Sequence, residues 1–247
     1  MTEVTTERTS LHDKVIVIIL AGGSGTRMMS DIPKQFLEIH GRQMVDYSLD
    51  MFLTHPYTRQ IIIVCEDKYL KYFNEYSGLL FAASSTVSRF RSFIKGFEIV
   101  RKNFQLSDND LIAIHDSARP FISSRSFTDV CNDAKDHGAA TLAVKCKSTI
   151  KLSESSELFV SSTLDRTFLW ETQTPQVFRF DVLNKSVETF LCEEMPQDDP
   201  TDEAGLVERY VRVKLTQGQD YNIKVTTPND FIIANAIALN RYMEICF

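Results

Sequence analysis

The sequence predicts an α/β fold, a doubly wound and mostly parallel sheet from which a β-hairpin arm protrudes. Three observations support this prediction. Apolar strand patterns alternate with helical patterns from Val15 to Val144, the first strand runs directly into a glycine-rich turn, and the alternation breaks near Thr149. Strands that alternate with helices are joined by right-handed crossovers, which place helices on both faces of a parallel sheet.

The first strand and its turn are the most informative stretch of the chain. Val15–Leu20 is an uninterrupted apolar run rich in β-branched residues, typical of the buried centre of a parallel sheet. The turn Ala21–Gly25 holds three glycines, whose backbone N–H groups can cradle phosphate oxygens. Arg27 and Lys34 follow within ten residues and supply two cations. The dinucleotide pattern is excluded because Met28 replaces its last glycine, and the P-loop is excluded because no Gly-Lys pair follows.

The next elements alternate regularly. Predicted helices cover 44–53, 67–76, 90–100 and 124–137, and predicted strands cover 61–65, 79–83, 111–114 and 139–144. The strand at 111–114 runs directly into His115–Pro120. Ligands of doubly wound sheets bind beyond the carboxyl ends of the strands, so we expect this segment to lie beside the glycine-rich turn.

The pattern changes after the strand at 139–144. Residues 149–152 and 158–164 flank a polar turn and predict an antiparallel hairpin, the core of an arm at about 147–172. An isolated hairpin is only marginally stable, so we expect it to pack on a partner subunit in a homodimer. Helices at about 180–192, 201–210 and 228–242, a strand at 211–216 and a short strand around Lys224 complete the predicted domain. We expect residues 1–13 to be a flexible tail and 14–247 to be a single domain.

Composition limits the class of protein. The chain has 247 residues, 43% hydrophobic and 24% charged, with a formal charge of −6, which argues against a nucleic-acid partner. The five cysteines are odd in number, widely spread and free of C-x-x-C spacing, which favours a reduced chain without disulfides or zinc. No run has the length or composition of a membrane span or a secretory signal. We therefore expect a cytoplasmic protein, in a bacterial cytosol or alternatively a plastid.

The segment His115–Pro120 carries an acid and a base three residues apart. Asp116 is a candidate Mg²⁺ ligand, because Mg²⁺ prefers carboxylate, water and phosphate oxygens, or it caps the following turn. Arg119 would bind a substrate phosphate or pair with Asp116. Ser92, near the start of a predicted helix, would hydrogen-bond a nucleobase or belong to an ordinary capped surface helix.

Four further motifs are weak when taken singly. They are L-D-R at 164–166, T-P-Q at 174–176, T-D-E-A at 201–204 and N-I-K-V-T-T-P at 222–228. A solvated ion pair, a capped acidic helix turn and a surface lysine would account for three of them without any function.

Taken together, the motifs are specific. The ordered set G-G-x-G-x-R-M, P-K-Q, H-D-S-A-R-P, L-D-R, T-P-Q, T-D-E-A and N-I-K-V-T-T-P resembles the 2-C-methyl-D-erythritol 4-phosphate cytidylyltransferases of isoprenoid biosynthesis. The resemblance spans about residues 14–240. H-D-S-A-R-P and L-W-E-x-Q-T-P-Q-V are similar to the plastid-type branch of that family.

The resemblance implies a Rossmann-like nucleotidyltransferase that transfers CMP from CTP to methylerythritol phosphate with Mg²⁺, and it implies a role for each matching residue. The implied catalytic residues are Arg27, Lys34 and Lys224; the implied CTP-binding residues are Ala21, Gly22, Gly23, Gly25, Ser92 and Asp116, with Asp116 also holding the metal. The implied substrate-binding residues are Arg119, Thr149, Arg166, Thr174, Thr201 and Asp220. In this family the arm mediates dimerisation, and its arginine reaches the partner's active site.

One departure from the family and two rival functions remain. The family has Gly-Gly before the arginine that aligns with Arg89, whereas this chain has Ser84–Ser88 with one inserted residue, which places cytosine selectivity in question. A ribitol-5-phosphate cytidylyltransferase shares the fold, CTP and N-I-K-V-T-T-P, but T-D-E-A and L-D-R favour the isoprenoid enzyme. A catalytically inactive nucleotide-binding protein is the second rival, and retention of Arg27, Lys34, Asp116 and Lys224 argues against it.

Overall fold

The computed structural model describes residues 14–23, 32–84, 88–154, 158–192 and 198–246. The predicted tail at 1–13 lies outside the described residues, as do Gly25 and Arg27 of the glycine-rich turn. No helix within the described ranges is long and apolar enough to cross a membrane.

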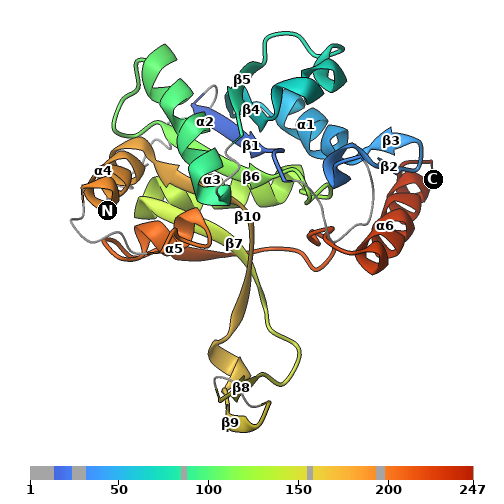
Figure 1. Ribbon diagram of the computed structural model, residues 1–247, viewed down its shortest axis with the longest axis vertical. Coiled ribbons are helices and arrows are strands. Elements are labelled where there is room, and N and C mark those ends of the chain that lie inside the picture. Colours follow the sequence, from blue (N-terminus) through green and yellow to red (C-terminus); the bar gives the residue numbers. More distant parts are fainter. Residues whose placement is uncertain (1–13, 24–31, 85–87, 155–157, 193–197, 247) are drawn as a thin grey trace, which may run out of the picture.

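A seven-stranded sheet forms the centre of the molecule, with the strand order β11-β7-β10-β6-β1-β4-β5 (Figure 1). β1 pairs in parallel with β4 and β6, as do β4 with β5 and β7 with β11. The prediction of a mostly parallel, doubly wound sheet is therefore confirmed. The strands are β1 (Val15–Leu20), β4 (Thr58–Cys65), β5 (Leu80–Ala83), β6 (Leu111–Asp116), β7 (Ala139–Lys145), β10 (Trp170–Arg179) and β11 (Lys214–Gln217).

Helices cover both faces of this sheet, which explains why β1 is apolar at every position. Successive side chains of a strand point to opposite faces. Val15, Val17 and Ile19 accordingly belong to the core beneath α1 (Met44–Thr54) and α3 (Ser124–His137). Ile16 and Ile18 belong to the core beneath α2 (Arg89–Asn103), α4 (Phe180–Leu191) and α5 (Glu203–Val207).

A third, smaller core joins the C-terminal helix to the segment after the glycine-rich turn. Helix α6 (Pro228–Cys246) packs Ala234 and Ala238 against the short hairpin of β2 (Glu38–Ile39) and β3 (Arg42–Gln43). The two turn residues of that hairpin, His40 and Gly41, both have positive φ, as a tight two-residue hairpin turn requires. Just before it, η2 (Lys34–Phe36) is a single 3₁₀ turn.

Strand β10 is the main feature that the sequence did not predict. It lies antiparallel between β6 and β7, and its pairing with β7 is irregular between Thr172 and Gln176. Its centre reads T-Q-T-P-Q, and a polar stretch with an internal proline lacks the usual pattern of a central strand. The interruption of the ladder at these residues is what accommodates the proline.

Four local predictions need correction. Residues 67–76 form a 3₁₀ helix, η3 (Asp67–Phe73), and not an α-helix. The predicted helix at 201–210 is the single short helix α5, and the predicted strand at 211–216 is β11, which begins three residues later. Lys224 lies in an irregular segment, because backbone N–H and C=O groups of this stretch bond to neighbouring loops and side chains.

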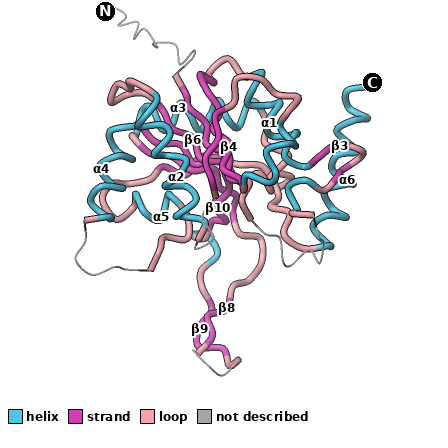
Figure 2. The backbone as a smooth tube through the Cα atoms, turned by 45° about the horizontal axis from the view of Figure 1, so that its top comes forward, coloured by secondary structure: helices cyan, strands magenta, loops and turns pink. Residues whose placement is uncertain are grey.

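The predicted hairpin arm is present. β8 (Lys151–Ser153) and β9 (Val160–Thr163) pair antiparallel and form a sheet of their own. Figures 1 and 2 show the arm extending away from the central sheet, from the ends of β7 and β10. All of its described residues from 151 to 168 are exposed, including the apolar side chains of Leu158, Phe159 and Phe168.

Helix α2 approaches the sheet so closely at Gly96 that a side chain there has no room. A Cβ at Gly96 would lie 2.8 Å from a methyl group of Ile18 and of Val64. We predict that Gly96→Ala lowers the free energy of unfolding by about 1–3 kcal/mol, because the overpacking outweighs the roughly 1 kcal/mol gain in helix propensity. Urea unfolding checks this, with Lys102→Ala on the exposed face of α2 as the control. A Gly96→Ala protein as stable as the control would contradict the packing described.

Candidate active site

The glycine-rich turn and the segment after β6 meet at one edge of the sheet, as the sequence predicted. β1 and β6 are parallel neighbours, and their last residues, Leu20 and Asp116, are opposite one another. The backbone N–H and the hydroxyl of Ser117 both donate to the carbonyl of Leu20, at 3.1 and 2.8 Å. Asp116 therefore lies directly beside the start of the glycine-rich turn.

Asp116 is a buried carboxylate held by two cations. Arg89 Nε donates to Oδ1 at 2.8 Å, and Lys224 Nζ lies 2.6 Å from Oδ2. Burial alone would raise the pKa of Asp116, but the Arg89 guanidinium and the Lys224 ammonium outweigh burial and hold this pKa well below its usual range. Asp116 is thus ionised throughout the neutral range, and it contacts Lys224 and Arg89 rather than Arg119.

A second buried carboxylate holds the other end of the same guanidinium. Nη1 of Arg89 donates to both oxygens of Glu203, at 2.8 and 2.9 Å, and the side chain of Glu203 is fully buried. Burial raises the pKa of Glu203, and the contact with Arg89 opposes that rise. Asp202, the residue before it, caps α5 by accepting a hydrogen bond from Gly205 N, so the capped turn expected for T-D-E-A is confirmed.

A chain of hydrogen bonds through Thr174 and His115 fixes the backbone of Asp116. The Asp116 N–H donates to Thr174 Oγ1 at 3.1 Å, and Thr174 Oγ1 lies 3.1 Å from His115 Nδ1. His115 Nε2 lies 3.1 Å from the carbonyl of Arg119, which can only accept, so Nε2 carries the proton and Nδ1 accepts from the Thr174 hydroxyl. Burial lowers the pKa of His115 to about 4, which keeps the ring neutral.

The P-K-Q motif joins two other predicted segments at this edge. Lys34 Nζ donates to the carbonyl of Val225 at 2.9 Å, next to Lys224 in the N-I-K-V-T-T-P segment. The side-chain amide of Gln35 donates to the carbonyl of Ala21, where the glycine-rich turn begins. P-K-Q therefore contacts both the start of the glycine-rich turn and a motif that is 191 residues away in the chain.

Two adjoining cavities open at this edge of the sheet, and Asp116 lines the smaller of them. The smaller, about 200 Å³, is lined by Arg89, Asp116, Arg119, Thr172, Gln173, Thr174, Gln176, Thr201, Asp202 and Lys224. The larger, about 410 Å³, is lined by Arg119, Val144, Lys145, Lys147, Glu171, Thr172, Gln173, Asp220, Ile223 and Lys224. The residues common to both are Arg119, Thr172, Gln173 and Lys224, so Lys224 lies where the two cavities meet.

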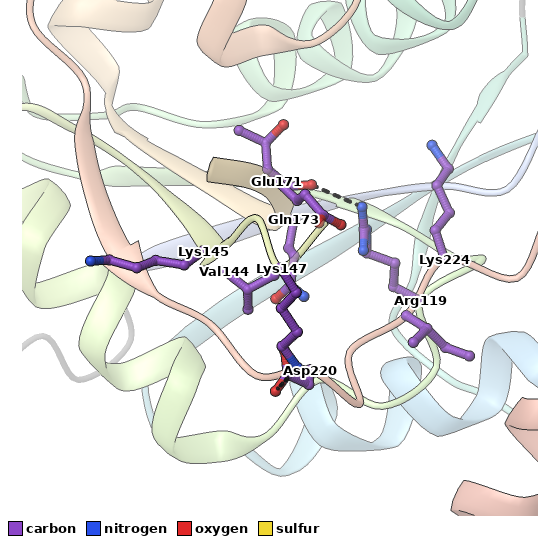
Figure 3. A pocket seen from close by; sticks show the side chains of 10 residues that line it. Arg119, Val144, Lys145, Lys147, Glu171, Gln173, Asp220 and Lys224 are labelled. Carbon is purple, nitrogen blue, oxygen red and sulfur yellow. Dashed lines mark hydrogen bonds and ion pairs between the residues drawn. The ribbon is translucent and has the colours of Figure 1, made fainter. Parts of the chain in front are cut away.

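The larger cavity is mainly cationic. Lys147 Nζ lies 2.6 Å from Asp220 Oδ2. Figure 3 shows this pair on one side of the cavity and Arg119 with Lys224 on another. Arg119 is fixed by its donors, since Nη1 binds the carbonyl of Asn222 at 2.8 Å and Nη2 that of Thr172 at 3.1 Å. Four cations against the two acids Glu171 and Asp220 suit an anionic ligand.

Of the predicted site residues that the structure describes, seven line neither of these cavities: Ala21, Gly22, Gly23, Lys34, Ser92, Thr149 and Arg166. Thr149 is exposed, and Arg166 Nη1 donates to the carbonyl of Lys147 at 2.9 Å. Ser92 lies buried in the first turn of α2, where its hydroxyl donates to the carbonyl of Ser88. A side chain at Gly22 would collide with Ser84, so Gly22 permits the turn to pass close to the altered loop.

Sequence reasoning passed over several residues of the site. Glu203 was predicted only as part of a capped, acidic first turn of a helix, and the apolar residues that follow it place α5 against the core. Arg89, which stands after the altered loop, was given no role in the site. Lys145 and Lys147 belong to none of the motifs, and Glu171 belongs to L-W-E-x-Q-T-P-Q-V but was given no role; these residues reach the larger cavity because β7 and β10 are neighbours in the sheet.

The side chains available as metal ligands determine how a metal ion could bind at this site. Among the described residues, no group of three or more His, Cys, Asp or Glu side chains is placed to hold an ion. Mg²⁺ commonly takes one or two carboxylates, keeps several waters and completes its shell with substrate phosphates. A lone Asp116 fits that pattern as the protein's share of a site completed by a triphosphate, and it does not fit a site formed by the protein alone.

Comparisons with known proteins agree on one family. The family model for 2-C-methyl-D-erythritol 4-phosphate cytidylyltransferase matches residues 15–240. A protein of that name from Lachnospira eligens is 37% identical over 88% of this chain and 96% of its own length. The chloroplastic protein of that name from Oryza sativa subsp. japonica is 36% identical over 90% of this chain and 74% of its own length.

Solved structures agree with the sequence relatives. The crystal structure of 4-diphosphocytidyl-2C-methyl-D-erythritol synthase from Anaerococcus prevotii superposes with a TM-score of 0.74 at 29% identity, covering 91% of this chain and 98% of that one. A second crystal structure of a synthase of the same name gives a TM-score of 0.75 at 27% identity, over 93% and 100% of the two chains.

The buried neutral state of His115 predicts a specific loss of stability in acid. An unfolded histidine has a pKa near 6.5, so between about 6.5 and about 4 the unfolded chain binds a proton that the folded chain does not. This contribution is present above pH 6.5 and is lost as the pH falls toward 4, by up to about 3 kcal/mol in all. We predict that His115→Gln unfolds with a shallower pH dependence in this interval.

Urea unfolding of both proteins at pH 7.0 and 4.5, in the presence of a chelator, measures this difference. The comparison cancels contributions from groups that the two proteins share. Equal pH dependence in the two proteins would show that the His115 ring is not held neutral by the fold.

Proposed function

The chain belongs to the 2-C-methyl-D-erythritol 4-phosphate cytidylyltransferase family, and from this premise we propose how its site carries out the transfer of CMP. The enzyme joins CTP and 2-C-methyl-D-erythritol 4-phosphate to give 4-diphosphocytidyl-2-C-methyl-D-erythritol and pyrophosphate, a step of non-mevalonate isoprenoid biosynthesis. The structural observation that supports this role best is the Lys224–Asp116 pair at the boundary of two adjoining cavities.

The reaction exchanges one phosphorus–oxygen bond for another. An oxygen of the acceptor's phosphate attacks the α-phosphorus of CTP, and the bond from that phosphorus to the oxygen bridging to the β-phosphate breaks, with pyrophosphate taking the electron pair. A phosphate monoester is already anionic near neutral pH, so the reaction needs neither a protein nucleophile nor a strong general base. Catalysis then depends on orientation and on stabilising the charge that develops.

We assign that task to two lysines of the described site. Lys224 lies between the two cavities, where it would contact the α-phosphate. Lys34 donates a hydrogen bond to the carbonyl of Val225, the residue that follows Lys224 in the chain. We assign to Arg27 and to the turn residues Ala21, Gly22, Gly23 and Gly25 the binding of the triphosphate, and to Ser92 a contact with cytosine. These assignments rest on the motif spacing and on the meeting of β1 and β6 at one sheet edge.

We assign Mg²⁺ to Asp116. When bound, the ion would neutralise phosphate charge and orient the triphosphate. Asp116 suits this role because it is ionised, buried and next to the glycine-rich turn. Its oxygens, now held by Arg89 and Lys224, would need to share or exchange a partner when a metal–nucleotide complex arrives.

The larger cavity is our candidate for the acceptor. Arg119 and Asp220 line it, Thr201 lines the smaller cavity beside it, and Thr174 supports the backbone of Asp116. Thr149 and Arg166 lie on or near the arm, so in this proposal they act on the partner subunit's site. The exposed apolar side chains of the arm favour a homodimer, and the four cysteines whose side chains the structure describes are free, which favours a reducing cytosol.

The activity is tested by measuring pyrophosphate release from CTP and Mg²⁺ with methylerythritol phosphate and ribitol 5-phosphate side by side. We expect release with methylerythritol phosphate alone. Release with ribitol 5-phosphate would retain the chemistry and change the acceptor. No pyrophosphate release with either acceptor, despite measurable CTP binding, would indicate an inactive nucleotide-binding protein.

Removing either lysine should lower turnover strongly. We predict that Lys34→Ala and Lys224→Ala each reduce kcat by roughly two orders of magnitude or more, the scale seen when a donor that stabilises developing charge is lost. Lys102→Ala, on the exposed face of α2, serves as the control and should retain wild-type turnover. Near-normal kcat in both site variants would defeat the roles assigned to these lysines.

A charge on the arm should separate the subunits. Phe159 on the arm and Ile232 on α6 have the same exposed fraction, 68%, which makes them a matched pair. We predict that Phe159→Asp converts the dimer to a monomer in light scattering and lowers turnover, because an arm residue can no longer reach the partner's site, whereas Ile232→Asp remains dimeric. Wild-type mass and activity for Phe159→Asp would exclude the arm as the interface.

A further inference from the structure

A continuous chain of buried charges runs from the start of α5 to the carboxylate at the centre of the site. Arg89 lies between Glu203 and Asp116, with Nη1 on both oxygens of Glu203 and Nε on Asp116, all at 2.8–2.9 Å. Glu203 is fully buried, and Asp116 is nearly so. Each contact of Arg89 uses a different edge of its planar guanidinium, so the two carboxylates together determine its orientation.

The stability of the fold does not explain why Glu203 is buried. Removing a carboxylate from water is costly, and replacing a buried ion pair by apolar residues of similar volume is often neutral or stabilising. Nη2 of Arg89 is also buried and has no hydrogen-bond partner among the described residues, which adds to the cost. The arrangement therefore holds Arg89 in one position without satisfying all of its donors.

Glu203 is itself fixed to the central sheet. Gln176 of β10, which is buried, accepts from the N–H of Ala204 at 2.8 Å and donates to Asp202 at 2.7 Å. Asp202 also caps α5. The residues on both sides of Glu203 are thus anchored to β10, so this carboxylate is a rigid support.

A second acid joins the same two segments at the rim of the site. Asp199 accepts from Ser88 Oγ and lies 2.8 Å from Arg91 Nη2. This pair lies at the same helix start as the Arg89 pair, but its side chains are more exposed and neither contacts Asp116. Asp199 therefore offers a matched control, since it links the same segments without reaching the centre of the site.

We propose that Glu203 is a positioning residue of the CMP transfer: it holds Arg89 in the orientation that keeps Asp116 in place when Lys224 leaves that carboxylate for a substrate phosphate. This inference rests on the proposed function. Among the described residues, Asp116 has two cationic partners, and the transfer requires one of them, Lys224. Arg89 is then the remaining one of these two partners, and Glu203 is the other carboxylate that holds Arg89 in place.

The test is a double-mutant cycle between Arg89 and Glu203, read as kcat and KM separately. We expect Glu203→Gln to lower kcat about tenfold or more, since small misplacements in a site are amplified in the rate. KM for CTP and for the acceptor should change less than about threefold. Because Glu203 acts through Arg89, the double variant Arg89→Gln/Glu203→Gln should be no slower than Arg89→Gln alone. Asp199→Asn should retain kcat within about threefold.

Two results would overturn the proposal. One is a multiplied loss in the double variant, which would show that the residues act independently; the other is a Glu203→Gln protein with altered KM and unchanged kcat. Should Glu203→Gln alone fail to fold by circular dichroism, the double variant, which buries neither of these charges, decides: kcat at least tenfold lower with unchanged KM supports the proposal, and kcat within threefold overturns it. An inactive wild-type protein would instead refute the proposed function.

Discussion

The ion pairs around Asp116 are the constraint on which the rest of the site depends. A buried carboxylate is stable only with close partners, and Asp116 draws one from the start of α2 and another from the segment before α6. Arg89 lies 27 residues before Asp116 in the chain, and Lys224 lies more than a hundred residues after it. The glycine-rich turn, P-K-Q and N-I-K-V-T-T-P meet because the sheet edge places them around one negative charge.

The sheet supports that charge through β10. This antiparallel strand lies between β6 and β7. Its Thr174 accepts a hydrogen bond from the backbone N–H of Asp116, and its Gln176 accepts one from the backbone at the start of α5. The same strand places Glu171 and Thr172 on the larger cavity. The ladder of β10 is irregular at its polar, proline-containing centre, and the same residues supply side chains to both cavities.

That dual role explains what the sequence could and could not predict. Long apolar runs such as Val15–Leu20 specify buried parallel strands, and those elements were predicted almost to the residue. β10 was missed because T-Q-T-P-Q serves the site and so lacks a strand pattern. Glu203 was missed for a related reason: an acid in a helix's first turn is usually exposed, and its partner Arg89 is 114 residues away in the chain.

The cations of the site divide into two kinds, and the division follows from their chemistry. Arg89 forms ion pairs with two carboxylates, which together fix the orientation of its planar guanidinium group. Lys224 and Lys147 instead each contact a carboxylate oxygen and are partly exposed. A flexible ammonium can turn from that oxygen toward a phosphate oxygen, and at Asp116 the fixed Arg89 continues to balance the charge of the carboxylate. The free protein therefore keeps these two lysines on partners that a substrate phosphate can replace, while the arginine behind them remains fixed as substrates enter and pyrophosphate leaves.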